Sequence, residues 1–187
     1  MNTKQEKYMK GKLLISNSSI IKDYFNKTVI LVVDHDESGA FGLVINKASD
    51  LSLRDVVKDL PPFEGDEKPV FSGGPVDQSY ISILYDNPEF ADLGGEVISG
   101  VYIGRSYDLL IKLIHSQSRF HLFQGYSGWS SGQLEAEFDK LSWVVHEAKK
   151  ETIFIESDAE SVWKNSLIEK GGLYKYYVEH TKDPMLN

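Results

Sequence analysis

Glycine, aromatic and carboxylate side chains gather most densely in residues 119–137, RFHLFQGYSGWSSGQLEAE. The pattern predicts a short apolar strand, then a glycine loop, then the first turns of a helix. In the loop, Tyr126 and Trp129 could stack on the ring of a ligand or cover the edge of the core. Gln133 and Glu137 stand four residues apart and so share one side of the helix. A carboxylate placed there could act as a general base or stabilise the helix N-terminus.

Residues 128–132 match the G-x-S-x-G pattern, in which a serine nucleophile stands on a sharp turn directly between a strand and a helix. Here we expect the strand to end at Gln124, which leaves a loop of several residues before Ser130. Acyl hydrolysis on Ser130 is therefore disfavoured. The alternative is a glycine loop that leads to the N-cap of the helix near Gly132.

Two further glycine-containing segments follow apolar strands, the acidic turn 34–39 and the loop that begins with Gly73 and Gly74. Such loops can hold an anion with backbone N–H groups, or they can be tight corners of a sheet. The acidic turn begins like a calcium loop, but its twelfth position is Ile45 instead of glutamate, so we expect a hairpin turn. His35 in this turn is either a solvated histidine or an acid–base group.

The composition narrows the possible functions. The chain has 187 residues, which suits one domain with a sizeable core, and a formal net charge of −8. This charge and the scattered lysines disfavour direct binding to nucleic acid or to an anionic membrane surface. Because there is no cysteine, disulfides and thiolate sites are excluded. No histidine pair has metal-ligand spacing and no nucleotide-binding glycine motif occurs, so no metal and no cofactor is expected.

The amino-terminal residues are polar and lack the apolar segment of a signal peptide. No uncharged apolar run approaches the roughly 20 residues that a membrane helix needs. We therefore expect a cytoplasmic protein without a membrane-spanning segment. Residues 1–10 are expected to form a disordered tail, and residues 11–187 a single domain.

Strands and helices are expected in an irregular order. Apolar and β-branched runs predict strands at 12–16, 28–34, 40–46, 69–72, 80–85, 96–103, 120–124, 143–146 and 152–155. Apolar residues at helical spacing predict helices at 51–60, 106–116, 133–141 and 159–170. Ser52, Ser106 and Asp158 are the expected N-caps, and residues 173–180 are expected to dock as an aromatic tail. Because hairpins interrupt any βαβ alternation, the order indicates an α+β fold.

The segments GAFGLVIN, FSGGPV and GYSGWSSGQLEAE, in this order and spacing, resemble the AlgH/YqgE family of bacterial proteins over nearly the whole chain. The resemblance implies a single domain with a mostly antiparallel sheet that is bent or bifurcated into a pseudo-barrel, with about four packed helices. It also implies a largely uncharacterised function, although one branch of the family is named as a transcriptional regulator of alginate synthesis. Ala48 departs from the family pattern, which commonly has proline at this position.

We expect a non-enzymatic binding domain or an indirect regulator, whose partner is an unknown small molecule or protein. Its site would lie where the three glycine-containing segments converge. The expected binding residues are His35, Asn46, Gly73, Gly74, Gly125, Tyr126, Trp129, Gln133 and Glu137. The alternative is an enzyme that uses Glu137 or His35 as general base, with the loop amides holding a small anion. Direct DNA binding ranks third because of the charge.

Overall fold

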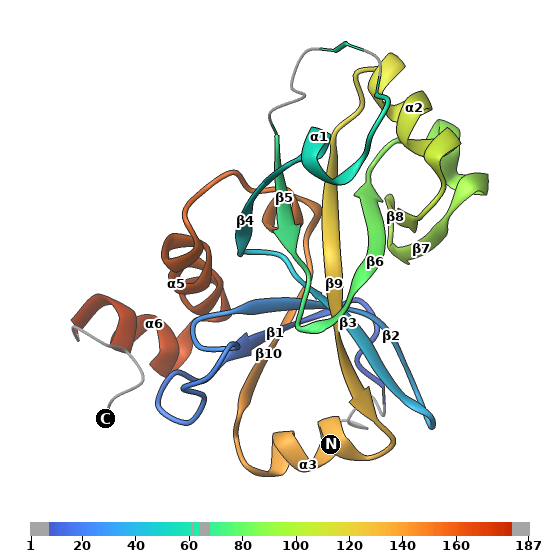
Figure 1. Ribbon diagram of the computed structural model, residues 1–187. Helices are drawn as coiled ribbons and strands as arrows, with labels where there is room; N and C mark the ends of the chain where they lie inside the picture. The colour runs from blue at the N-terminus through green and yellow to red at the C-terminus, as the bar shows by residue number, and fades with distance from the viewer. Residues whose placement is uncertain (1–7, 61, 64–67, 181–187) are drawn as a thin grey trace.

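The computed structural model describes residues 8–60, 62–63 and 68–180, so most of the expected N-terminal tail lies outside the described residues. Strands and helices are mixed along the chain, as in an α+β fold (Figure 1). The strands are β1 (Lys12–Ser16), β2 (Val29–Asp36), β3 (Gly39–Val44), β4 (Ala48–Ser52), β5 (Pro69–Ser72), β6 (Val76–Tyr85), β7 (Gly95–Ile98), β8 (Val101–Gly104), β9 (Phe120–Ser130) and β10 (Trp143–Glu147). The helices are α1 (Leu53–Val56), the 3-10 helix η1 (Pro88–Leu93), α2 (Tyr107–His115), α3 (Gln133–Asp139), α4 (Lys150–Ile153), α5 (Ala159–Lys170) and α6 (Gly172–His180).

All ten strands belong to one curled sheet. The main path runs β10-β1-β2-β3-β9-β6-β8-β7, and β5 joins β4 to β9 beside this path. The pairing of β5 with β9 is parallel, whereas the pairings along the main path are antiparallel. The prediction of a mostly antiparallel, bifurcated sheet is therefore confirmed.

Strand β9 is common to both halves of the sheet and runs the length of the molecule from α2 to α3 (Figure 1). Phe123 pairs with both β5 and β6, whereas Trp129 pairs with β3. Between them Gly125 has a φ of 68°, and a Cβ at this position would lie 2.6 Å from the carbonyl oxygen of Gly74. The change of partners along β9 thus occurs at a residue where a side chain would be strained and would clash.

The packing of the core explains why every residue from 29 to 33 is apolar. Along β2, Leu31 and Val33 belong to a cluster that α5 closes with Trp163, while Ile30 and Val32 face a second cluster. This second cluster contains Trp129, Leu134 and Trp143 and is covered by α3. A third cluster packs α2 against β6 and the first half of β9. Strand β2 is therefore buried on both faces.

The N-caps form as expected. The side chain of Ser106 accepts a hydrogen bond from the amide of Leu109 at 3.1 Å, and Asp158 accepts one from Ser161 at 2.9 Å. Ser52 and Asp55 are joined by two hydrogen bonds at the start of α1. The first helix is nevertheless short, since Val57 is already extended.

Three of the expected strands were wrong. The strand predicted at 120–124 continues to Ser130 as β9, and the strand predicted at 152–155 is replaced by the short helix α4, Lys150–Ile153. The strand predicted at 96–103 is the hairpin of β7 and β8, which turns at Gly100 with a φ of 73°. The aromatic tail docks as expected, and it does so as a helix, α6, which packs against α5.

Candidate functional site

The glycine-containing segments meet along β9. The amide of Gly73 donates to the carbonyl oxygen of Gln124 at 2.9 Å, and a Cβ on Gly74 would lie 2.1 Å from the carbonyl carbon of Tyr126. Further along β9, Gly39 at the start of β3 pairs with Ser130. These glycines let backbone pack directly against backbone. In this conformation the Gly73 amide is already bonded and is not free to hold an anion.

Tyr126 belongs to an aromatic cluster at this junction. Its ring centroid lies 5.0 Å from that of Phe41 and 5.2 Å from that of Tyr80. The guanidinium of Arg105 lies 3.8 Å from the centre of the Tyr80 ring. The protein itself therefore supplies stacking partners for Tyr126.

Glu137 anchors two indoles. One carboxylate oxygen accepts hydrogen bonds from the indole nitrogens of Trp129 at 2.9 Å and Trp143 at 2.7 Å. The other oxygen accepts one from the side-chain amide of Gln133 at 3.1 Å. Both tryptophans are buried in the cluster under α3. These bonds tie α3 to β9 and β10, which is a structural role for Glu137 and Gln133.

His35 lies in strand β2 and is 6% exposed, so it is not a solvated turn residue. Its Nδ1 accepts the amide hydrogen of Met9 at 3.0 Å, and its Nε2 lies 3.2 Å from a carboxylate oxygen of Glu135. Because Nδ1 is an acceptor, the ring proton is on Nε2 and is donated to Glu135. Both nitrogens of His35 are occupied, and the contact links β2 to α3.

The expected loop before Ser130 is absent. Ser130 ends β9, only Ser131 and Gly132 follow, and α3 then begins, so the segment has the strand–turn–helix order of a nucleophile elbow. However, the hydroxyl of Ser130 donates to the side-chain oxygen of Gln133 at 3.2 Å. Its hydrogen bond goes to a helix residue instead of to a base.

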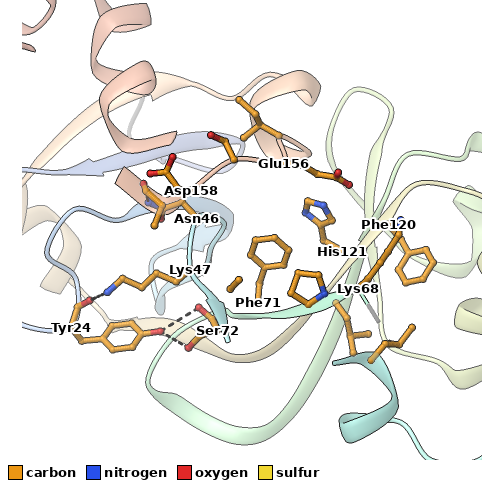
Figure 2. A pocket seen from close by; sticks show the side chains of 17 residues that line it. Tyr24, Asn46, Lys47, Lys68, Phe71, Ser72, Phe120, His121, Glu156 and Asp158 are labelled. Atoms are coloured by element: carbon orange, nitrogen blue, oxygen red, sulfur yellow. Dashed lines mark hydrogen bonds between the residues drawn. The ribbon is translucent and has the colours of Figure 1, made fainter. Parts of the chain in front are cut away.

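A hollow of about 710 Å³ is here called the main pocket (Figure 2). It lies where β4, β5 and the first half of β9 meet the segment that joins α4 to α5. Most of its wall is apolar. Its lining consists of Tyr24, Asn46, Lys47, Ala48, Leu53, Lys68, Pro69, Phe71, Ser72, Phe120, His121, Leu122, Ile155, Glu156, Ser157, Asp158 and Ala159. Of the expected site residues, Asn46 lines this pocket.

His121 is the distinctive polar residue of the wall and is 8% exposed. Its ring stacks on Phe71, with centroids 4.6 Å apart, and meets Phe154 edge-on at 5.3 Å. Its Nδ1 is buried and has no hydrogen-bond partner among the described residues. Burial, together with the positive charges of Lys68 and Arg119, lowers the pKa of His121 to about 4. The ring is therefore neutral near pH 7.

The opposite end of the main pocket is polar (Figure 2). The ammonium of Lys47 donates to the carbonyl oxygen of Tyr24 and lies 4.5 Å from the centre of the Tyr24 ring. The hydroxyl of Tyr24 is 2.6 Å from that of Ser72. Burial lowers the pKa of Lys47, and the charge of Asp23 partly opposes this shift.

Asn46 holds the rim of the main pocket in place. Its side-chain oxygen accepts the amide hydrogen of Val29 at 2.8 Å, and its side-chain nitrogen donates to the carbonyl oxygens of Lys27 at 3.0 Å and Ala159 at 2.8 Å. Ala159 is the first residue of α5, next to its cap Asp158. Backbone groups thus occupy both N–H donors of the Asn46 side chain and one of the two lone pairs on its oxygen.

Smaller hollows lie elsewhere in the described part of the chain. One of about 420 Å³ lies between α2 and Phe120, and one of about 200 Å³ lies beside Trp129 and the 34–41 hairpin. Among the described residues, no group of three or more histidine, aspartate or glutamate side chains could hold a metal ion. No helix in the described ranges has both the length and the apolar character to cross a membrane.

The fold and sequence define the class of protein. The family model described as AlgH-like matches residues 13–175. This chain therefore belongs to the AlgH-like family. It is 34% identical to a UPF0301 protein of Chlorobium phaeobacteroides over 187 residues, 97% of each chain, and 34% identical to one of Cytophaga hutchinsonii, over 95% of this chain and 98% of that one.

Two solved structures have the same fold as this chain. The solution structure of the AlgH protein from Pseudomonas aeruginosa has a TM-score of 0.74 and 27% identity, and covers 94% of this chain and 96% of that one. A crystal structure of a protein from Corynebacterium diphtheriae has a TM-score of 0.75, with 90% of each chain covered. Its 21% identity shows the shared fold alone.

Sequence reasoning missed His121, Lys47 and Lys68 as site residues because none of them stands at a spacing typical of a catalytic or binding motif. One signal was present in residues 120–123, FHLF, where a lone histidine interrupts an apolar strand. Such a residue must find a partner or remain neutral once it is buried. The lysines carried no comparable signal.

Proposed function

We propose that the protein is a non-enzymatic, cytoplasmic binding domain. Its ligand is a small, largely apolar molecule with an anionic group, and it occupies the main pocket. The observation that supports this most directly is His121, a buried imidazole in the pocket wall that has no hydrogen bond from either ring nitrogen to the described residues. Buried polar groups without partners are rare and often mark a missing ligand or water.

The shape and lining of the main pocket support the same proposal. A volume of about 710 Å³ is within the range of small-molecule sites, which are mostly apolar with a few polar groups that orient the ligand. Lys47 and Lys68 supply positive charge at positions where an anionic group would be held.

Binding is favoured over catalysis by the state of the titratable groups. A histidine with a pKa of about 4 is a weak base near pH 7, where general bases work best with a pKa near the working pH. The earlier candidates for acid–base or nucleophilic chemistry, His35, Ser130 and Glu137, are hydrogen-bonded to other protein groups and do not line the main pocket.

Any regulatory role would be indirect. A net charge of −8 disfavours contact with the phosphates of DNA, so a regulatory signal would pass from the occupied pocket to a protein partner. Absence of binding to generic duplex DNA at low salt is the expected result, because electrostatic binding is strongest there.

The test is a search for ligands on the intact protein, by native mass spectrometry of freshly purified material and by thermal shift with metabolite-like acids. A48W places a large side chain in the pocket from a position that is exposed. A136W makes the same change on exposed α3, away from the pocket. Ligands should stabilise the native protein and A136W but not A48W. Equal stabilisation of A48W would place the site elsewhere, and turnover of the bound compound would make the protein an enzyme.

A further inference from the structure

The ligand class can be narrowed, on the assumption that the proposed function is correct. The main pocket presents its functional groups in a fixed order (Figure 2). His121 and Lys68 stand at one end, the ring of Phe71 faces the middle, and Lys47 lies at the other end. A ligand that fills the pocket must therefore meet a charged end and an aromatic surface together.

The end with His121 offers hydrogen-bond donors. Because Nδ1 is sealed in the wall without a partner, Nε2 is the ring nitrogen left to meet a ligand. A neutral imidazole carries one proton, and an unpartnered buried N–H is rarer than an unpartnered acceptor, so the proton belongs on Nε2. His121 therefore points a donor, without a formal charge, at the pocket.

Lys68 supplies the charge at the same end. Its ammonium lies 5.7 Å from the centre of the Phe120 ring, and no carboxylate of the described residues lies within 4.0 Å of it. Arg119, the other cation near His121, is different because it is paired with Asp86. Lys68 is thus a partly buried cation without a carboxylate partner among the described residues, and a ligand anion could serve as its counterion.

The charges at this end disfavour a second negative charge on the ligand. Glu156 lines the same end of the pocket as His121 and Lys68 (Figure 2). One lysine and one carboxylate sum to about zero, and His121 is uncharged. A monoanion gains the lysine and the Nε2 donor, whereas a phosphate dianion would place a second charge beside Glu156.

The middle of the main pocket favours a ligand whose central part is apolar. Phe71 stacks on His121 on one side and is only partly buried. Leu53 and Leu122 are further apolar parts of the lining. A flat aromatic body can lie on the exposed part of the Phe71 ring in an offset stack, which adds a specific contact to the burial of apolar area. The volume of the main pocket is larger than a single aromatic ring would fill.

We infer that the main pocket binds an aromatic monocarboxylic acid, with the carboxylate between Nε2 of His121 and the ammonium of Lys68 and the ring system on Phe71. Both oxygens of the carboxylate then have donors, and Nε2 of His121 gains an acceptor. No covalent step is involved.

The probe is 2-naphthoate, and its binding to the intact protein is measured by isothermal titration calorimetry. Its neutral amide, 2-naphthamide, and its dianionic counterpart, 2-naphthyl phosphate, should each bind about tenfold more weakly. K68M should weaken naphthoate binding about tenfold and leave the amide unchanged, whereas K140M, on the exposed end of α3, should change neither. E156Q should tighten naphthoate binding, since it removes a like charge.

His121 is tested by two variants. H121F keeps the aromatic wall but removes the donor and should lose about tenfold in naphthoate affinity, while H121Q keeps a donor and should bind within a few-fold of the native protein. Tighter binding of the phosphate than of naphthoate, or unchanged naphthoate binding in both K68M and H121F, would overturn the inference. If another class of compound binds the native protein but not A48W, this inference fails while the proposed function stands. If no compound is sensitive to A48W, both fail.

Discussion

The imidazole of His121 stacks on the ring of Phe71, with the ring centroids 4.6 Å and the ring planes 24° apart. This contact suits a neutral imidazole, because it replaces water with carbon atoms on one face of the ring. A proton added to the ring would place a charge in an apolar wall. The stability of the protein should therefore depend on the protonation of this residue.

Stability should fall as the pH falls from about 6.5 to about 4. The pKa of His121 is about 4 in the folded protein and near 6.5 in the unfolded chain, so between these values the unfolded state binds more protons. The contribution is present above the unfolded pKa and is lost toward the folded pKa; a shift of this size corresponds to about 3 kcal/mol. Urea unfolding across this pH range measures it.

H121Q should lose this part of the pH dependence, because glutamine does not titrate. H115Q, a matched change at an exposed histidine, provides the baseline. A slope of stability against pH that is the same in the native protein and in H121Q would contradict the buried neutral histidine.

Glu137→Gln should destabilise the protein by about 2 kcal/mol, since a neutral amide is a weaker acceptor for two indole N–H groups and its NH₂ group adds a donor. Asp139→Asn on the same helix is the control, because Asp139 is exposed. Chemical unfolding followed by tryptophan fluorescence measures both changes. Equal stability of the two variants would rule out the anchoring role.

Gly125→Ala and Gly132→Ala distinguish the cost of backbone strain from the cost of a steric clash when a Cβ is added. Both glycines have a φ near 70°, but a Cβ at Gly125 would lie 2.6 Å from the carbonyl oxygen of Gly74, whereas one at Gly132 would meet open space. G132A should cost about 1 kcal/mol from backbone strain alone. G125A should cost at least twice as much, and the thermal midpoint of each variant checks this order. A reversed order would mean that the bend of β9 does not depend on the missing Cβ.

Asn46→Asp should cost about 3 kcal/mol, because the donor shared by the carbonyl oxygens of Lys27 and Ala159 becomes a charged acceptor. Asn165→Asp, at an exposed position in α5, should change the free energy of unfolding by less than about 0.5 kcal/mol. Unfolding is measured without added ligand. A stable N46D that loses only ligand binding would instead support direct contact between Asn46 and the ligand.

Local chemistry made part of the fold predictable. Ser106 and Asp158 have side chains that can satisfy helix amides within three residues, so no distant contact is needed to place α2 and α5. The hairpin of β2 and β3 likewise follows from two apolar runs and the short turn with Gly39. In both cases the residues whose interaction determines the structure are close together in the sequence.

The errors arose where distant contacts override local preference. Gly125 and Gly128 suggested a loop, because glycine is common in loops. Both lie inside β9, where close neighbours leave little room for a Cβ. Residues 152–155 are β-branched and aromatic, which favours a strand. Instead Ile153 and Phe154 pack into the cluster under α5, and the segment turns as α4.

The main pocket was beyond prediction for a related reason. Its wall is assembled from separate segments, from Tyr24 to Ala159, so no short window contains the pattern. The glycines of the segment that ends at Glu137 let neighbouring strands approach closely. Glu137 itself accepts hydrogen bonds from two tryptophan side chains. The dense stretch 119–137 therefore indicates the family and contributes Phe120, His121 and Leu122 to the pocket, but it does not by itself reveal the pocket.

The pairing of β1 with β10 has a consequence for the newly made chain. Lys12 at the start of the fold pairs with Glu147, 135 residues later, and their side chains form an ion pair at 2.7 Å. One edge of β1 therefore has no partner until β10 has left the ribosome. During most of synthesis this apolar strand presents an unpaired edge, which is the form most prone to aggregate and most suited to chaperone binding.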